Sequence, residues 1–396
     1  MNEQTTLIFN DEFYNEIHGK KVKTVNPPVY SGSTVLFESY EDLTAAINGR
    51  YKGIAYGTDR LPTQRAFEEA LCSLERGFVT RAFPSGINAI INTLLTYTET
   101  GDHILLCENV YGPTARFCKK VLRKYGVAVD FLPGAVGEEV ANHLRENTRL
   151  IYLESPGSNT FEIHDIPAVT AIARQRGIIT MLDNTWATPL YLKALELGID
   201  ISIQSVSKYI SGHSDLLLGA VTVNERYAQE FIDFYRVMEN FASPHDCALA
   251  LRGLKTLHLR LRQHEHSALS IARQLQIHPL VDQVIHPALA EHPQHHLWQR
   301  DFQGSTGLFG FTFKRDYTPE ELALFINSLQ LFGIGFSWGG YKSLITAGKY
   351  RRDSALGGKT IIRLNIGLEE PEDLLADLEH GFTALTNKAG NRARTT

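Results

Sequence analysis

Six short apolar runs, separated by helical stretches, constrain the fold of this chain more than any other feature. They are rich in β-branched residues and lie at 103–107, 127–132, 150–153, 178–182, 199–204 and 220–223. Runs of this length that alternate with helices indicate a largely parallel sheet with helices on both faces. The sequence therefore predicts an α/β fold.

The segments before these runs have a different character. Residues 1–60 contain several turn signals and few helical patterns, so we expect an arm that packs on something else. Residues 63–77 place their apolar side chains on one helical face, with Thr63 as the expected N-cap. A second helix is predicted over 87–97, directly after the small-residue turn Ser85-Gly86.

The end of the chain predicts a second, smaller domain. Helical patterns and the apolar segment LFGFTFK follow residue 255, and a late strand is expected at 361–366. This mixture is typical of an α+β unit. We therefore divide the chain into an arm (1–60), a ligand-binding domain (61–255) and a C-terminal domain (256–396).

Length and composition narrow the class of protein. A chain of 396 residues exceeds the size of one hydrophobic core, and its net charge of −5 gives no general attraction to nucleic acid or an anionic membrane. The four cysteines form no CxxC pair, and the acidic amino terminus lacks the apolar segment of a signal peptide. We expect a cytoplasmic protein with a small-molecule partner.

Informative polar residues follow four of the apolar runs. In an open parallel sheet, ligands bind beyond the carboxyl ends of the strands. The run ending at 153 leads to Ser158, the run ending at 182 leads to Asp183, and the run ending at 204 leads to Lys208. Tyr111 follows the first run. A lysine, a carboxylate, an aromatic ring and hydroxyls are thus expected around one crevice.

That set of side chains matches the needs of pyridoxal 5′-phosphate (PLP). The cofactor requires an amine for its aldehyde, a carboxylate that keeps its pyridine nitrogen protonated, a ring to stack on and donors for its phosphate. Lys208 is the expected amine, Asp183 the carboxylate and Tyr111 the ring. The expected phosphate donors lie at a helix start and beside the lysine, at Ser85, Gly86, Ile87, Ser205 and Ser207.

The string SVSKYISGHSD around Lys208 resembles the lysine signature of the cysteine/methionine-metabolism family of PLP enzymes. Further segments resemble that family in the same order, namely FPSGINAI, ENVYGPT, LESPGSNTFEIHDIP, LDNTWATP, RGLKTLHLRLRQH, FSWGGYKSL and TIIRLNIGLEE. The resemblance implies an aspartate-aminotransferase-like fold of type I, with a PLP-binding domain at 61–255. It also implies a homotetramer built from dimers that share their active sites, with the arm contributing to a neighbouring subunit.

Within the family, the segment Ser337-Trp338-Gly339-Gly340 resembles the cystathionine β-lyase branch, and Pro156-Gly157-Ser158 does the same. The resemblance implies a β-elimination on cystathionine or a related cysteine-derived amino acid, giving a thiol, pyruvate and ammonia. Arg363 would bind the substrate α-carboxylate, and Ser158, Ser337 and Trp338 would also contact substrate. Lys208 would take the α-proton, and Lys208, Tyr111 or Tyr56 of a neighbouring subunit would protonate the sulfur.

Two positions depart from the family pattern. An arginine that binds phosphate across the dimer interface is expected two residues after Tyr56, but this position is Thr58. Arg60 either reaches the phosphate in its place or the charge is lost. Lys342 stands where relatives carry a glutamate near the distal end of the substrate, and a cation there disfavours a distal ammonium.

Other functions and local interpretations stay open. A γ-lyase or γ-synthase acting on a homoserine- or homocysteine-derived amino acid, a side activity such as alanine racemisation, and a catalytically degenerate binding protein all fit the family. Locally, Asp183 could be a turn former and Arg363 a structural salt bridge. The histidines at 264, 266, 292, 295 and 296 lack metal-ligand spacing and are expected on a solvated face.

Overall fold

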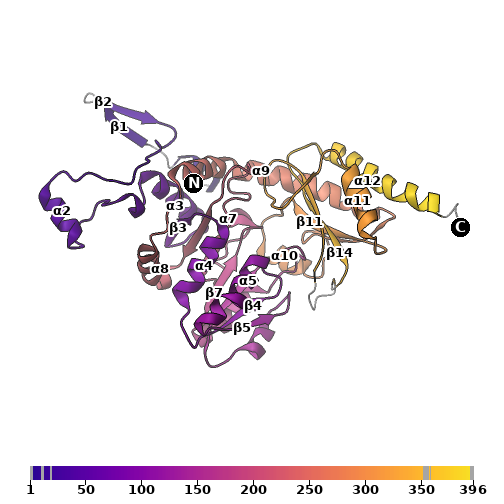
Figure 1. Ribbon diagram of the computed structural model, residues 1–396, viewed down its shortest axis with the longest axis horizontal. Helices are drawn as coiled ribbons and strands as arrows, with labels where there is room; N and C mark the ends of the chain where they lie inside the picture. Colours follow the sequence, from indigo (N-terminus) through magenta and orange to yellow (C-terminus); the bar gives the residue numbers. More distant parts are fainter. Residues whose placement is uncertain (1–2, 10–12, 18–19, 351–355, 357, 393–396) are drawn as a thin grey trace.

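The computed structural model describes residues 3–9, 13–17, 20–350, 356 and 358–392. Two sheets, each with its own helices, lie side by side, and an arm extends from the first (Figure 1). The predicted arm (1–60) and C-terminal domain (256–396) therefore lie partly outside the described residues. No helix among the described residues has the length and apolar character needed to cross a bilayer.

A seven-stranded sheet forms the larger unit. Its strands run in the order β3-β9-β8-β7-β6-β4-β5. Their bounds are β3 (Val79–Phe83), β4 (His103–Cys107), β5 (Ala128–Leu132), β6 (Thr148–Glu154), β7 (Ile179–Asp183), β8 (Ile201–Gln204) and β9 (Gly219–Val223). Every side chain of β4, β7, β8 and β9 is buried, as expected for strands covered on both faces.

The predicted α/β fold is confirmed, with two differences in the sheet. The neighbours from β5 to β8 are parallel, whereas β9 runs antiparallel to β8. The chain returns from β8 to β9 through residues 205–218, which contain no crossover helix, so a parallel arrangement is not available. Strand β3, which the sequence analysis missed, pairs antiparallel with β9 at the sheet edge.

Helices cover this sheet, and one expected cap is wrong. The helices are α3 (Pro62–Glu75), α4 (Gly86–Tyr97), α5 (Gly112–Lys120), α6 (Ile166–Arg176), α7 (Thr188–Tyr191) and α8 (Glu225–Met238), with 3-10 turns η1 (Gly57–Asp59), η2 (Leu122–Tyr125) and η3 (Glu138–His143). The N-cap of α3 is Leu61, because Pro62 occupies the first helical position. The Thr63 hydroxyl instead accepts a hydrogen bond from Tyr30 N at 2.8 Å.

The smaller unit contains a mixed five-stranded sheet in the order β10-β11-β14-β13-β12. Its elements are α9 (Pro244–Ile277), β10 (Val281–Ile285), α10 (His295–Asp301), β11 (Leu308–Phe313), α11 (Pro319–Ser328), β12 (Gly333–Ile334), β13 (Leu344–Lys349), β14 (Thr360–Asn365) and α12 (Pro371–Arg392). The segment LFGFTFK contains β11, and the late strand expected at 361–366 is β14.

Helix α9 joins the two units without a break. Its first half packs Leu254, Leu257 and Leu261 into a buried cluster of the larger unit. Its second half packs Ala268 and Ile271 into the core of the smaller unit. The predicted boundary at 255 therefore falls inside a continuous helix, and the division into domains stays a prediction.

The arm holds α1 (Glu3–Phe9), the hairpin of β1 (Phe13–Ile17) with β2 (Lys20–Thr24), and α2 (Tyr40–Ile47). In Figure 1 the hairpin and α2 project away from both sheets, in indigo at the left. Leu36, Tyr40 and Ile47 are 87%, 77% and 76% exposed. Large apolar side chains that are left uncovered in this way are typical of a surface that meets another protein.

Candidate active site

Lys208 lies in the irregular segment that follows β8. Its Nζ donates a hydrogen bond to Ser337 Oγ at 2.6 Å and lies 5.3 Å from the centre of the Trp338 ring. Burial, and after it the positive charge of Arg363, lower the pKa of this amine to about 8, with the carboxylate of Asp183 opposing both effects. A neutral amine is therefore accessible near physiological pH, as a nucleophile or proton acceptor requires.

Asp183 is the last residue of β7 and is buried at the same sheet edge. Thr185 donates to Asp183 Oδ1 from its backbone N–H at 3.1 Å and from its hydroxyl at 2.5 Å. Burial raises the pKa of Asp183, while the Thr185 donors and the Lys208 charge oppose that rise. Both Thr185 bonds end on Oδ1, so Oδ2 keeps its acceptor capacity for a ligand.

The amino end of α4 packs tightly against the segment that holds Lys208. A Cβ added to Gly86 would lie 2.7 Å from Ser205 Oγ, so only glycine fits. The Ser85 side chain caps α4 by accepting from Asn88 N at 3.2 Å, and the remaining N–H groups of this turn favour an anion. Ile87 follows in the same turn and is half-buried.

The two serines expected beside the phosphate differ in their contacts. Ser207 Oγ donates to the Leu218 carbonyl at 3.2 Å and accepts from Leu218 N at 2.9 Å. Its proton therefore already serves the backbone. Among the described contacts none uses the Ser205 hydroxyl, which lies against Gly86. Ser205 is consequently the better phosphate donor of the two.

Arg363, on β14, reaches the same region from the smaller sheet. Its Nη1 donates to Asn159 Oδ1 at 3.2 Å and its Nη2 to the Ser337 carbonyl at 3.3 Å. Within the described part of the chain no carboxylate pairs with it, so the structural salt bridge considered from the sequence is not found there. The Arg363 guanidinium is thus a largely desolvated cation with no described counter-ion, which makes it suited to bind an anionic ligand.

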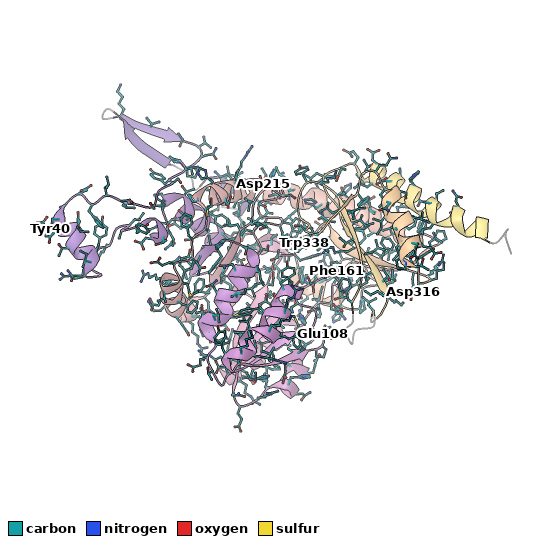
Figure 2. All side chains as sticks on the ribbon, in the orientation of Figure 1. Tyr40, Glu108, Phe161, Asp215, Asp316 and Trp338 are labelled. Atoms are coloured by element: carbon teal, nitrogen blue, oxygen red, sulfur yellow. The ribbon has the colours of Figure 1, made fainter. Side chains whose placement is uncertain are left out.

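The segment of Ser337 and Trp338 rests directly on Lys208. A Cβ at Gly339 would come within 2.7 Å of Tyr209 N and 2.9 Å of Lys208 C, and the φ of Gly339 is +81°. The Trp338 ring packs at 5.5 Å from the Tyr209 ring. Figure 2 shows Trp338 near the middle of the molecule, between the two sheets.

Tyr111 and Ser158 lie on loops at the same sheet edge. Tyr111 N donates to Glu154 Oε2 at 2.5 Å, and Glu154 pairs with Asp183 across β6 and β7. Ser158 N donates to the carbonyl of Asn109, two residues before Tyr111, at 2.7 Å. The structure thus brings together the lysine, carboxylate, arginine and serine side chains, with Tyr111 beside them. These are the donor groups that PLP requires.

Comparison with known proteins agrees with this chemistry. Residues 12–383 match the family described as Cys/Met metabolism PLP-dependent enzyme. The chain belongs to this family. PLP is the cofactor of the Cys/Met metabolism enzymes, and the donor set around Lys208 fits it.

Members of the family resemble the chain over nearly its whole length. It is 40% identical over 371 residues to cystathionine beta-lyase MetC of Escherichia coli (strain K12), covering 91% of this chain and 94% of that one. It is 36% identical over 401 residues to the L-alanine/L-glutamate racemase of Wolbachia pipientis wMel, covering 97% and 98%. The crystal structure of metB from Corynebacterium glutamicum matches with a TM-score of 0.88, 30% identity and 98% coverage of each chain.

Tyr56 and its neighbours, by contrast, line a different surface of this family member. Tyr56 and Thr58 border a hollow of about 350 Å³ together with Ser31, Ser33 and Phe241. Arg60 Nε bonds to Glu68 Oε2 at 2.6 Å, and Glu68 is almost fully buried. The Arg60 guanidinium is therefore committed within its own chain, and no described contact joins this group to Lys208.

The backbone of Lys342 is linked to the Trp338 segment through Asn365, but no described contact joins the Lys342 amine to the cluster. The Lys342 carbonyl accepts from Asn365 Nδ2 at 3.0 Å. A Cβ added to Gly333 would lie 3.4 Å from the Lys342 Cε, so the side chain extends along β12. The expected role of Lys342 at the far end of a substrate stays a prediction.

The sequence analysis missed three supporting residues and misplaced two histidines. Thr185 and Asn159 hold Asp183 and Arg363, as described above. Asn365 Oδ1 accepts from Gly339 N at 2.9 Å and so fixes the Trp338 segment. His264 and His292 are buried, not solvated, because ring nitrogens of each bond to backbone groups. The sequence offered one signal for Thr185 and Asn159: each is a polar residue close to a predicted site residue, Asp183 or Ser158.

Proposed function

We propose that the chain is a PLP-dependent carbon–sulfur lyase that performs β-elimination on cystathionine or a related cysteine-derived amino acid. The observation that carries the proposal is Lys208, a buried amine whose pKa is lowered to about 8 and which is influenced by the charges of Asp183 and of Arg363, an arginine with no described acidic partner. Cystathionine beta-lyase MetC of Escherichia coli, at 40% identity, supports the same reaction.

The cofactor, when bound, supplies a carbonyl for the substrate amine and an electron sink for the carbanion that follows. Asp183 would keep the pyridine nitrogen protonated, with its carboxylate held by the two Thr185 bonds. The amino end of α4 and Ser205 would bind the phosphate. Tyr111 would supply the stacking ring, and Arg363 would bind the substrate α-carboxylate.

Lys208 is the base for the α-proton. At its lowered pKa a useful fraction of the amine is neutral, and the Ser337 hydroxyl 2.6 Å away restrains its position. As the carbon–sulfur bond breaks, the electron pair leaves with sulfur, which takes a proton from Lys208, from Tyr111, or from Tyr56 of a neighbouring subunit. Hydrolysis of the remaining three-carbon fragment gives pyruvate and ammonia.

The assembly belongs to the proposal as well. We expect a homotetramer, a dimer of dimers, in the cytoplasm. The exposed apolar side chains of the arm and the 50% exposure of Tyr56 support a partner surface there. Such an interface would bring Tyr56 and Thr58 of one subunit toward the site of the next.

The test is product analysis on PLP-saturated protein. L-cystathionine, L-cysteine and a small panel of homoserine- and homocysteine-derived amino acids are supplied, and the keto acid is identified. Pyruvate with a free thiol supports the proposal, 2-oxobutyrate identifies a γ-lyase instead, and the absence of a keto acid from every member contradicts a lyase. Lys208→Ala should lower the rate at least about 10³-fold, as loss of a catalytic base and nucleophile does.

Racemisation is the second candidate, favoured by the 36% identity to the Wolbachia enzyme over 97% of this chain. It requires proton return to the opposite face of the α-carbon, a role for which we propose Tyr111, the expected stacking residue. Loss of optical rotation from L-alanine, with no keto acid formed, would select this activity over elimination.

A further inference from the structure

The chain beyond β6 forms a tight turn that carries Asn159. Phe161 N donates to the Gly157 carbonyl at 3.0 Å and Gly157 N to the Glu162 carbonyl at 2.9 Å. Inside this turn Asn159 has a φ of +68°, in the left-handed region that asparagine tolerates better than most residues. The backbone thus fixes where the Asn159 amide lies.

That amide contacts the guanidinium of Arg363 from the other sheet. Asn159 Oδ1 accepts from Nη1 at 3.2 Å, joining residues 204 positions apart. The second acceptor, the Ser337 carbonyl, belongs to another non-glycine residue with positive φ, +82°. Two residues in an uncommon backbone conformation therefore hold one side chain, and such conformations persist mainly at functional sites.

The two groups that accept hydrogen bonds from Arg363, the Asn159 amide and the Ser337 carbonyl, are neutral, so they orient the guanidinium without neutralising its charge. A carboxylate in the place of Asn159 would orient the guanidinium but also cancel its charge. An amide oxygen and a carbonyl orient it while the charge stays available to an incoming anion. The remaining N–H groups of the fork are left for that anion.

We propose that Asn159 is a positioning residue, which fixes the guanidinium of Arg363 for the α-carboxylate of the substrate and so sets the preference for amino acids over simple amines. The inference rests on the proposed function only for the identity of the anion. Asn159 itself contacts the arginine and not the reacting atoms.

The experiment measures ligand affinity on PLP-loaded protein through the visible absorbance of the bound cofactor. L-Alanine and ethylamine serve as probes because they differ only in the carboxylate. Asn159→Gly keeps the left-handed backbone and removes the amide, so the dissociation constant for L-alanine should rise about 5- to 20-fold, the usual effect of a lost charge-assisted hydrogen bond. That for ethylamine should change less than about twofold.

Asn159→Asp places a charge against Arg363 and should weaken L-alanine about 100-fold or more. The control is Asn147→Asp, the same chemical change on an exposed residue just before β6, at the end of the strand away from the site. It removes the bond from Asn147 Nδ2 to the Gly101 carbonyl, and the affinity for both probes should match that of wild type. In turnover of any accepted substrate, Asn159→Gly should raise KM and leave kcat within about threefold.

Three results would overturn the proposal: wild-type affinity of Asn159→Gly for L-alanine, equal weakening of both probes, or no preference of the wild-type protein for L-alanine over ethylamine. An unchanged cofactor spectrum and thermal midpoint exclude misfolding as the cause of any loss. Because binding needs no turnover, these outcomes are separate from a failure to form pyruvate, which concerns the lyase proposal alone.

Discussion

At the scale of single residues, the site depends on charges whose surroundings shift them from their usual behaviour. Lys208 is the clearest case, because burial and the nearby Arg363 both favour its neutral form. The sequence predicted Lys208, Asp183 and Arg363 because each follows or lies in a strand within a recognisable motif. It could not predict Thr185 or Asn159 as their supports, since those roles depend on contacts that form only when the strands are assembled.

The lowered pKa of Lys208 predicts how apoprotein captures PLP. Only the neutral amine attacks the aldehyde, so the rate of capture should rise with pH and level off above an apparent pKa of about 8. Stopped-flow absorbance between pH 6 and 10 at fixed PLP measures this. A rate that still rises tenfold per pH unit beyond pH 9 would mean an ordinary, solvated lysine.

At the scale of elements, two glycines that begin helices, Gly86 in α4 and Gly112 in α5, differ in the space around them. Gly86→Ala would push a Cβ to 2.7 Å from Ser205 Oγ and displace the phosphate turn. Gly112→Ala, at the first residue of α5, meets nothing within 4 Å. We expect PLP affinity to fall about 10- to 100-fold for the first variant, as for a misplaced anion site, and to stay within about twofold for the second. Fluorescence titration of apoprotein with PLP gives both values.

A buried carboxyl between α3 and β8 makes the stability of the larger unit depend on pH. Glu75 Oε1 accepts from Ser202 Oγ and from Gln204 Nε2, both at 2.9 Å, and neither donor is charged. Burial raises the pKa of Glu75 from 4.5 to about 7. Between these values the folded chain binds more protons than the unfolded chain, so the free energy of unfolding should fall as pH rises.

The expected loss is about 3 kcal/mol between pH 4.5 and 7, with no further change from this group above pH 7. Glu75→Gln keeps an acceptor for both donors and cannot ionise, so its urea midpoint should exceed that of wild type at pH 8 and converge with it near pH 5. If the urea midpoints of the two proteins instead change with pH in parallel, the pKa of Glu75 is not raised by folding, and the prediction is wrong.

The elements also show where reading a sequence succeeds and where it stops. Strands β4 to β8 were predicted within about two residues, because they are short apolar runs, and in β4, β7 and β8 every side chain is buried. Strands β10, β12 and β13 were missed; β12 has two residues, and β13 buries only Ile345. The predicted boundary at 255 falls within α9, and nothing in a continuous helical pattern marks where one core gives way to the next.

At the scale of the whole molecule, Thr58 offers a test of shared active sites. Arg60 is paired with Glu68 within its own chain, which favours the alternative in which the phosphate charge is lost from this loop. Thr58→Arg should tighten PLP binding about tenfold if the loop reaches the site of a neighbouring subunit, by adding a charge-assisted contact. Thr58→Ala is the control and should change affinity little.

Sedimentation of both Thr58 variants reports the assembly. Tighter PLP binding together with a tetrameric mass supports sites that span an interface. A gain in affinity by a monomeric protein, or no gain by a tetramer, would contradict it. Either outcome leaves the contacts of Lys208 within one chain unchanged.

Helix α9, at 34 residues, is about 50 Å long and belongs to both hydrophobic cores. A hinge between the halves of the protein would have to break this helix, because both of its ends are embedded. The two units should therefore move as one rigid body, without opening and closing about a hinge. Substrate binding should then involve local movements of loops. The angle between the two sheets should be the same in every crystal form.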